Sequence, residues 1–361
     1  MSRHRKHHHN RAPHGPTHSR QRGFEGIDNE ATLINPHNLD VGVVVIGRNE
    51  GERLSLCIDA LLAAGVPGSQ LVYVDSGSSD GSLERMQARG VDAIAVEAPF
   101  TAAKGRNGGF QHLVDKHGPA LLAVQFVDGD CEYLPAWIDV ASNLLREDPT
   151  VAAVSGRMQE RHPEASVYNL LADLEWNGVV GDIDTFAGNV MVRVDALQKA
   201  GLYNPHLIAG EDPELSIRVR KATGQRIVLI DEPMCLHDVD MTTAGQWWRR
   251  CVRAGHAYAQ VSRMHGEAPR NFWKKETRSI WLWGALPVVA PALAGPAWGM
   301  LAWRIYAAAR RRGLDAKSAR TYALYTTAAK VPQAVGQLMY WVNELRGVKS
   351  KLIEYKGAAA A

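Results

Sequence analysis

The chain has 361 residues, of which 46% are hydrophobic and 22% charged, so it can bury a core large enough for one big domain or two. A formal net charge of +3 is too small to predict a nucleic-acid-binding protein, and we expect no nucleic-acid partner. The spacing of the four cysteines predicts neither a zinc site nor a disulfide framework. We therefore predict a globular protein of a reducing, cytoplasmic compartment, without a secretory signal at its first residues.

Residues 1–40 are rich in His, Arg, Pro, Gly and Asn and have almost no apolar periodicity, which predicts a disordered tail. Its run of His7, His8 and His9 is either a weak transition-metal site or a solvated polar arm. Beyond it we predict two regions, a sheet domain at 41–265 and a hydrophobic or amphipathic helical region at 266–361.

From residue 41 onward, apolar β-branched runs alternate with segments of helical periodicity. The predicted elements are a strand at 41–46, a helix at 52–64, a strand at 71–74, a helix at 82–89, a strand at 91–97, a helix at 104–116 and a strand ending at 127. This alternation predicts an α/β fold, an open and mostly parallel Rossmann-like sheet with helices on both faces.

A glycine and two aspartates stand at the ends of three of these strands, at the sheet edge where ligands bind in such folds. They are Gly47, Asp75 and Asp128, and the last begins the sequence Asp128-Gly129-Asp130. Alone, two aspartates around a glycine are consistent with a tight turn, a divalent-cation site or an acid/base pair. Their position at this edge favours a ligand site over a turn.

Several motifs in fixed order make residues 41–260 resemble the family 2 glycosyltransferases, inverting enzymes of the GT-A fold. The motifs are VVVIGRNE (43–50), VDSGSSDGS (74–82), KGRNGG (104–109), VDGD (127–130), FAGNVMVR (186–193), GEDPELSIR (210–218) and QWWRR (246–250). The last resembles a Gln-x-x-Arg-Trp signature of processive synthases, but Arg250 stands where tryptophan is usual. This departure favours transfer of a single sugar.

The resemblance implies a nucleotide-sugar donor, UDP- or GDP-linked, and a divalent cation, Mg²⁺ or Mn²⁺, because the departing diphosphate needs positive charge. It implies that Asp128 faces the nucleotide or the metal and that Asp130 binds the metal. His237 follows a predicted strand and is either a third metal ligand or a structural histidine.

On the donor side, the resemblance implies that Asp75 reads the nucleotide base. Asp80, in the same loop, fits a helix N-cap better than a ligand contact. The other donor-side candidates, for which solvated surface charge is the alternative, are Arg48, Glu50, Lys104, Arg106 and Asn107.

Inversion at the anomeric carbon needs a base to take the acceptor's proton, and a carboxylate suits this role. Asp212 is the predicted base and Glu211 its neighbour or substitute, because both stand at the start of a predicted helix; simple N-capping is the alternative. The resemblance alone implies that Trp176, Gly188 and Asn189 line the acceptor pocket. The other predicted acceptor-side or diphosphate contacts, for which a basic aromatic helix lying on a membrane is the alternative, are Gln246, Trp247, Arg249 and Arg250.

Residues 280–303 form a stretch of 24 residues without a charge, interrupted by three prolines and flanked on both sides by basic residues. These features favour a re-entrant hairpin or an interfacial segment over a straight span. A second segment, 322–345, has the pattern of an amphipathic helix. We expect association with the cytoplasmic side of the cell membrane; a soluble helical cap on the sheet is the alternative.

Together these features predict an inverting glycosyltransferase that moves one sugar to a lipid-linked or polysaccharide acceptor in cell-surface glycan synthesis. One alternative is a sugar-phosphate nucleotidyltransferase, although the glycine-rich opening expected of it is absent after the first strand. The other is a non-catalytic scaffold that binds nucleotide or membrane.

Overall fold

A computed structural model describes residues 40–176, 178–268, 270–350 and 353. The predicted tail, including its three consecutive histidines, lies outside these residues except for its last position.

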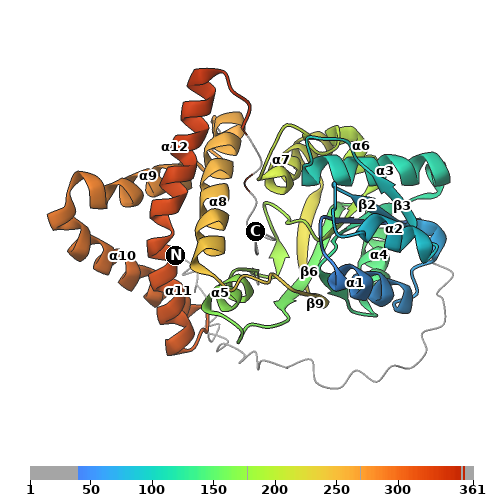
Figure 1. The fold of residues 1–361 in the computed structure, drawn as a ribbon, viewed down its shortest axis with the longest axis horizontal. Coiled ribbons are helices and arrows are strands. Elements are labelled where there is room, and N and C mark those ends of the chain that lie inside the picture. The colour runs from blue at the N-terminus through green and yellow to red at the C-terminus, as the bar shows by residue number, and fades with distance from the viewer. Residues whose placement is uncertain (1–39, 177, 269, 351–352, 354–361) are drawn as a thin grey trace, which may run out of the picture. The chain divides into compact units, whose positions relative to one another are not determined.

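The centre of the fold is a mixed sheet of nine strands within the described residues (Figure 1). The strands are β1 (Val41–Gly47), β2 (Leu71–Asp75), β3 (Asp92–Ala95), β4 (Ala123–Asp128), β5 (Cys131–Tyr133), β6 (Val151–Glu160), β7 (Gly181–Asp182), β8 (Val190–Arg193) and β9 (Arg226–His237). Their order is β3-β2-β1-β4-β8-β6-β9-β5, and β7 pairs with β9.

Helices cover both faces of this sheet and continue after it. The 3₁₀ turns are η2 (Gly68–Gln70) and η3 (Gly118–Ala120); the α-helices are α1 (Glu52–Ala63), α2 (Ser82–Ala88), α3 (Ala102–His117), α4 (Trp137–Glu147), α5 (Val167–Trp176), α6 (Val194–Ala200), α7 (Glu211–Thr223), α8 (Ala244–His265), α9 (Lys274–Val289), α10 (Pro291–Arg311), α11 (Ala316–Ala328) and α12 (Lys330–Arg346).

The alternation of side chains along β1 divides the core into two layers. Val43 and Val45 pack in the cluster that contains residues of α1 and α4, whereas Val44 and Ile46 pack in the cluster that contains residues of α3 and α7. In Figure 1, α1 and α4 lie on one side of the strands and α3 and α7 on the other. The predicted α/β sheet with helices on both faces is confirmed.

Two features differ from the sequence prediction. The strands β1 to β4 are parallel as expected, but β8 runs antiparallel to β4 and β6, and β5 and β7 run antiparallel to β9. The helix predicted at 104–116 begins two residues earlier, because Thr101 caps it by accepting a hydrogen bond from the Lys104 amide. Lys104 and Arg106 therefore lie in the first turns of α3 and not ahead of it.

The C-terminal region is helical, as predicted, and α12 packs closely along α8. Glycines make this approach possible: a Cβ atom at Gly336 would lie 2.0 Å from the Val252 carbonyl oxygen, and one at Gly255 would lie 2.0 Å from that of Gln333. No side chain larger than hydrogen fits at either position without moving the two helices apart.

The uncharged stretch at 280–303 is divided between α9 and α10, with the break at Ala290 and Pro291 as the first residue of α10. The segment predicted as one amphipathic helix at 322–345 is likewise divided, between α11 and α12. Among the helices of the described residues, we find none with both the length and the apolar character needed to cross a bilayer.

Candidate active site

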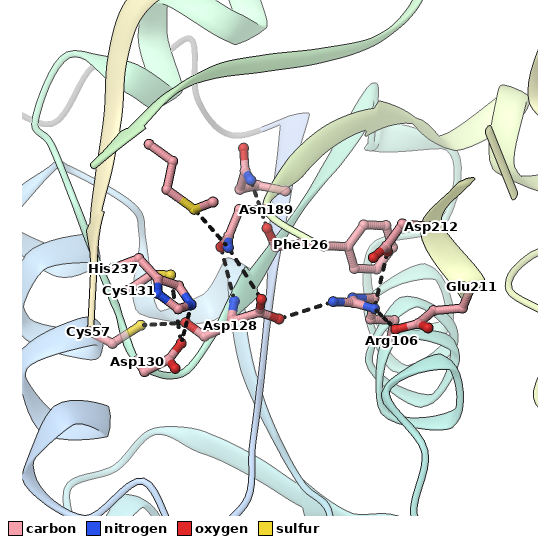
Figure 2. Close-up of polar contacts among 12 residues, drawn as sticks. Cys57, Arg106, Phe126, Asp128, Asp130, Cys131, Asn189, Glu211, Asp212 and His237 are labelled. Atoms are coloured by element: carbon pink, nitrogen blue, oxygen red, sulfur yellow. Dashed lines mark hydrogen bonds and ion pairs between the residues drawn. The ribbon is translucent and has the colours of Figure 1, made fainter. Parts of the chain in front are cut away.

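The predicted site residues gather at the carboxyl ends of β4 and β9 and at the beginning of α7 (Figure 2). Asp128 ends β4, His237 ends β9, and Glu211 and Asp212 occupy the first turn of α7. Three segments distant in the sequence thus contribute ionisable side chains to one edge of the sheet.

Arg106 connects the donor-side and base candidates. Its side chain is 3% exposed, and its Nη2 donates to Asp128 Oδ1 at 3.0 Å. Its Nη1 lies 3.1 Å from Glu211 Oε1 and 3.2 Å from Asp212 Oδ1. One buried guanidinium therefore holds three carboxylates, in the forked geometry that arginine offers and lysine does not.

The surroundings of Arg106 are shaped to hold it in place. A Cβ atom at Gly188 would lie 2.4 Å from Arg106 Nη2, so glycine is required for the ion pair with Asp128. The guanidinium also lies over the Tyr203 ring, 5.3 Å from its centroid. Asn107 exchanges two hydrogen bonds with the Tyr203 backbone, at 2.8 and 3.0 Å, and so fixes this ring beside α3.

Asp212 has the electrostatic properties of a general base. Burial raises the pKa of its carboxyl group from 3.8 to about 7; the Arg106 charge opposes this, and the negative charges of Glu211 and Asp128 add to it. The pKa of Arg106 is itself raised, because the neighbouring carboxylates outweigh its desolvation. A carboxylate with a pKa near neutrality accepts a proton more readily than an ordinary aspartate does.

Asp130 and His237 form a second group, beside Asp128 but pointing away from Arg106 (Figure 2). Asp130 is 4% exposed, and its Oδ1 lies 3.4 Å from His237 Nε2. A ligand atom of Cys131 lies within 4.8 Å of theirs. Burial raises the pKa of the Cys131 thiol well above its usual value, which keeps it protonated and a poor ligand.

An oxygen and an imidazole nitrogen converging on one point fit Mn²⁺ or Mg²⁺, because both cations accept oxygen ligands and Mn²⁺ accepts imidazole as well. The two carboxylate oxygens of Asp128 are instead engaged by side chains: Oδ1 accepts a hydrogen bond from Arg106, and Oδ2 accepts one from Asn189 Nδ2 at 3.3 Å. The described geometry thus fits a metal at Asp130 and His237, while a metal contact of Asp128 stays a prediction.

Two residues that the sequence analysis did not assign to the metal site lie beside His237, whose Nδ1 forms no hydrogen bond within the described part of the chain. Its Nδ1 lies 3.9 Å from Oε2 of Glu160, which is 1% exposed, and its ring packs edge-on against Trp176 at 4.5 Å. Glu160 is in turn fixed by the Asn169 amide at 3.2 Å. Trp176, predicted on the acceptor side, thus supports the histidine.

On the nucleotide side, Asp75 is 3% exposed and accepts three hydrogen bonds, from the Tyr73 hydroxyl and the Gly77 and Ser78 amides, at 2.8 to 2.9 Å. A carboxylate has about four acceptor positions, so one remains for a base N–H. Its role in reading the base stays a prediction. Asp80 accepts from the Ser82 amide at 3.0 Å, but the N-cap of α2 is Gly81, so Asp80 lies one residue ahead of the capping position predicted for it.

Three other donor-side candidates have different neighbours: Lys104 and Glu50 contact residues close to them in sequence, whereas Arg48 contacts the segment that precedes α3. Lys104 Nζ donates to the Glu97 carbonyl at 2.5 Å, Glu50 pairs with Arg53 at 3.1 Å, and the Arg48 guanidinium lies 5.3 Å from the centroid of the Phe100 ring. In this arrangement none of them joins the cluster around Arg106, and their nucleotide contacts stay predictions.

The acceptor-side candidates on α8 divide into two groups. Gln246 completes a capping box: its backbone amide donates to the Thr243 hydroxyl, and its side-chain oxygen accepts from the Thr243 amide at 2.9 Å. Trp247 and Arg250 instead line a cavity that also contains Glu211 and Asp212. Arg250 pairs with Glu175 at 2.9 Å, and Arg249 is absent from the lining of that cavity.

A solved structure supports the fold. The mannosyltransferase PcManGT from Pyrobaculum calidifontis, in complex with GDP-Man and Mn²⁺, aligns with a TM-score of 0.55 and 22% identity over 83% of this chain and 87% of its own. A TarS structure from S. aureus, residues 1–349, aligns with a TM-score of 0.44 and 14% identity over 86% and 92%. No curated protein matches the chain.

The sequence itself matches the model of glycosyl transferase family 2 over residues 42–189. That segment contains Arg106, Asp128, Asp130 and Asn189, whereas Asp212 lies beyond it. The match decides against the nucleotidyltransferase alternative. The chain is therefore similar to glycosyl transferase family 2 over residues 42–189, and it is a nucleotide-sugar-dependent glycosyltransferase with a GT-A type fold.

Proposed function

We propose that the enzyme transfers a single sugar, with inversion at the anomeric carbon, from a UDP- or GDP-sugar to a lipid-linked or polysaccharide acceptor in cell-surface glycan synthesis. Asp212 is the base in this proposal, and Asp130 with His237 holds the divalent cation. Asp128, Asp75, Arg48, Glu50, Lys104 and Arg106 are the donor-side residues.

The observation that carries this proposal is the continuous contact from Asp128 through Arg106 to Asp212. In an inverting displacement, the acceptor oxygen attacks the face of the sugar opposite the departing diphosphate, so the base must stand on the far side of the sugar from the diphosphate site. Arg106 lies between Asp128 and Asp212 and contacts both through different nitrogens. This arrangement is consistent with a donor-side role for Asp128 and a base role for Asp212.

Each residue of this proposal has a distinct task. Asp212 takes the proton from the acceptor hydroxyl, and Arg106 keeps its carboxylate oriented and limits the rise of its pKa. Glu211 shares the guanidinium and tunes that pKa by its negative charge. A divalent cation, when bound, supplies positive charge where the diphosphate gains negative charge.

The test uses the full chain with a panel of UDP- and GDP-sugars and Mn²⁺ or Mg²⁺, in the parent and in Asp212→Asn and Asp130→Asn. We expect both variants to lose roughly 100-fold or more in turnover, the scale of one general base or charge-stabilising group. Asp195→Asn is the matched control, since Asp195 is an exposed residue of α6 that pairs with Lys199. Unchanged turnover in both site variants, or a product of retained configuration, contradicts the proposal.

The acceptor and membrane assignments rest on the C-terminal helices. Large apolar side chains are exposed near the break between α9 and α10, with Val288 83%, Val289 73% and Leu293 64% exposed. A basic run follows at the end of α10, and apolar exposure beside basic charge is typical of helices that lie on an anionic bilayer surface. We therefore propose that these helices bind the cytoplasmic leaflet.

Co-sedimentation with vesicles tests the membrane assignment. Vesicles containing anionic lipid should retain the protein, and Val288→Asp with Val289→Asp should release it without loss of donor hydrolysis. Equal retention of parent and double variant, or no retention of the parent on anionic vesicles, contradicts it.

A further inference from the structure

A cavity of about 620 Å³ lies between the beginning of α7 and the helices α8, α11 and α12. Glu211 and Asp212 form part of its wall, whereas Asp75, Asp128 and Asp130 are not among its lining residues. Asp212 therefore stands between the donor-side aspartates and this cavity. That is the position expected of a base that receives a proton from a molecule bound in the cavity.

Two cations from the C-terminal helices face the same space. Arg253 of α8 and Lys330 of α12 line the cavity, and the Arg253 charge is a minor influence that opposes the rise of the Asp212 pKa caused by burial. Arg250, a third cation of the lining, pairs with Glu175. The α8 and α12 sides of the cavity thus carry positive charge.

Of these two cations, Lys330 gives the stronger indication that the cavity binds an anion. Burial lowers the pKa of its ammonium group, and the negative charge of Glu276 only partly offsets this effect. Within the described part of the chain, the ammonium has no ion-pair partner. A partly desolvated cation without a partner costs stability, and an anionic ligand recovers part of that cost.

Aromatic side chains complete the lining. Trp247 and Tyr325 meet edge to face at 5.5 Å, and Tyr258 and Trp273 lie 4.5 Å apart. Such rings offer flat apolar surface together with polar groups at their edges. A molecule with apolar C–H faces and many hydroxyl groups, such as a sugar, suits this combination better than a wholly apolar chain does.

We propose that this cavity is the acceptor site and that it takes a saccharide with an anionic group, a phosphate or a carboxylate, bound by Arg253 and Lys330. The inference rests on the proposed transfer reaction and adds the chemical class of its acceptor. The anionic group lies at the α8 and α12 wall, and the hydroxyl to be glycosylated lies at Asp212.

Saturation-transfer NMR on the full chain tests this inference without knowledge of the natural acceptor. The donor site is first filled with UDP or GDP and Mg²⁺, so that the probes cannot bind there. The probes are glucuronate, glucose 6-phosphate and the neutral methyl glucoside. The variants are Lys330→Gln and Arg253→Gln, and Lys317→Gln on α11, outside the cavity lining, is the control.

We expect at least one anionic probe to bind about tenfold more tightly than methyl glucoside, the scale of one charge-assisted hydrogen bond. Each cavity variant should remove that preference while leaving methyl glucoside unchanged, and Lys317→Gln should retain it. Binding of glucose 6-phosphate alone identifies a phosphate-bearing acceptor, and binding of glucuronate alone a uronic-acid acceptor.

The inference is overturned if no anionic probe is preferred, or if the preference survives in both cavity variants. Donor hydrolysis, measured on the same preparation, separates this outcome from failure of the proposed function. Hydrolysis without anion preference overturns only the acceptor class, whereas its absence with every donor and cation overturns the proposed reaction.

Discussion

Replacing Glu211 by Gln provides a direct test of the electrostatic coupling at Asp212. The substitution removes one negative charge while retaining an oxygen that accepts from Arg106. Two effects of the substitution lower the pKa of Asp212. The repulsion from the Glu211 charge, which raises this pKa, disappears, and the Arg106 charge, which lowers it, is shared with one carboxylate fewer. The pKa of Asp212 should therefore fall from about 7.

The size of this change follows from the geometry. Glu211 Oε1 and Asp212 Oδ1 lie 3.1 and 3.2 Å from the same Arg106 nitrogen. The sum of these distances limits their separation to about 6.3 Å, where an effective dielectric of about 20 gives a repulsion of roughly 2.6 kcal/mol. Since 1.36 kcal/mol corresponds to one pKa unit, we expect a fall of about one to two units after relaxation and salt screening.

The assay is the pH dependence of turnover at saturating donor, for the parent, Glu211→Gln and the control Asp195→Asn. A base must be deprotonated to act, so turnover rises with pH through the pKa of Asp212 and levels off above it. The parent and the control should share a midpoint near pH 7, and Glu211→Gln should reach its plateau at lower pH. A midpoint for Glu211→Gln at or above that of the parent refutes this account of the site.

Three further predictions concern stability and metal binding. The pKa of Asp212 is higher in the folded than in the unfolded state, so its ionisation costs stability as pH rises from about 4 to 7. The free energy of unfolding of Asp212→Asn should therefore exceed that of the parent by up to about 4 kcal/mol at pH 8 and equal it at pH 3, and a variant less stable than the parent at pH 8 contradicts this. Glu160→Gln should weaken Mn²⁺ binding about tenfold, as measured by electron paramagnetic resonance, and the exposed control Glu164→Gln should leave it unchanged. Equal Mn²⁺ affinities of the parent and Glu160→Gln exclude a role for Glu160 in orienting His237. Gly336→Ala should lower the free energy of unfolding, measured by urea denaturation, by about 1–3 kcal/mol. Gly295→Ala should not lower it, because there is open space around Gly295 on α10, and equal effects of the two substitutions contradict the close packing of α8 and α12.

The parallel half of the sheet was predictable because its signals are local. The β-branched run at Val41–Gly47 and the strand Leu71–Asp75 are buried throughout or nearly so, and such continuous apolar runs are typical of parallel strands. The antiparallel strands gave weaker signals: β7 has two residues and β5 three, too few for periodicity to be read. Their pairing depends on tertiary contacts with β9 and not on their own sequence.

The sequence allowed us to name candidate site residues, but it did not predict which side chains contact one another in the folded site. Asp130 and His237 were predicted as ligands from chemistry and motif order, and the fold brings them within 3.4 Å. Arg106 was predicted to contact the donor, but its ion pairs with Glu211 and Asp212 join residues about a hundred positions apart. Glu160 gave no signal, because a glutamate at the end of a strand looks like an ordinary surface residue until its 1% exposure is known.

The division of the site along the chain has a consequence for specificity. Asp128, Asp130 and Arg106 lie inside the segment 42–189 that matches the family, whereas Asp212 and the cations of the cavity lie after it. In the proposed arrangement, the donor side therefore comes mainly from the segment that matches the family, with His237 as the exception, and the acceptor side comes from α7 together with the helices that follow it. Since α12 contributes Lys330 only while it packs on α8 through Gly255 and Gly336, separation of these two helices should impair acceptor binding before it impairs donor hydrolysis.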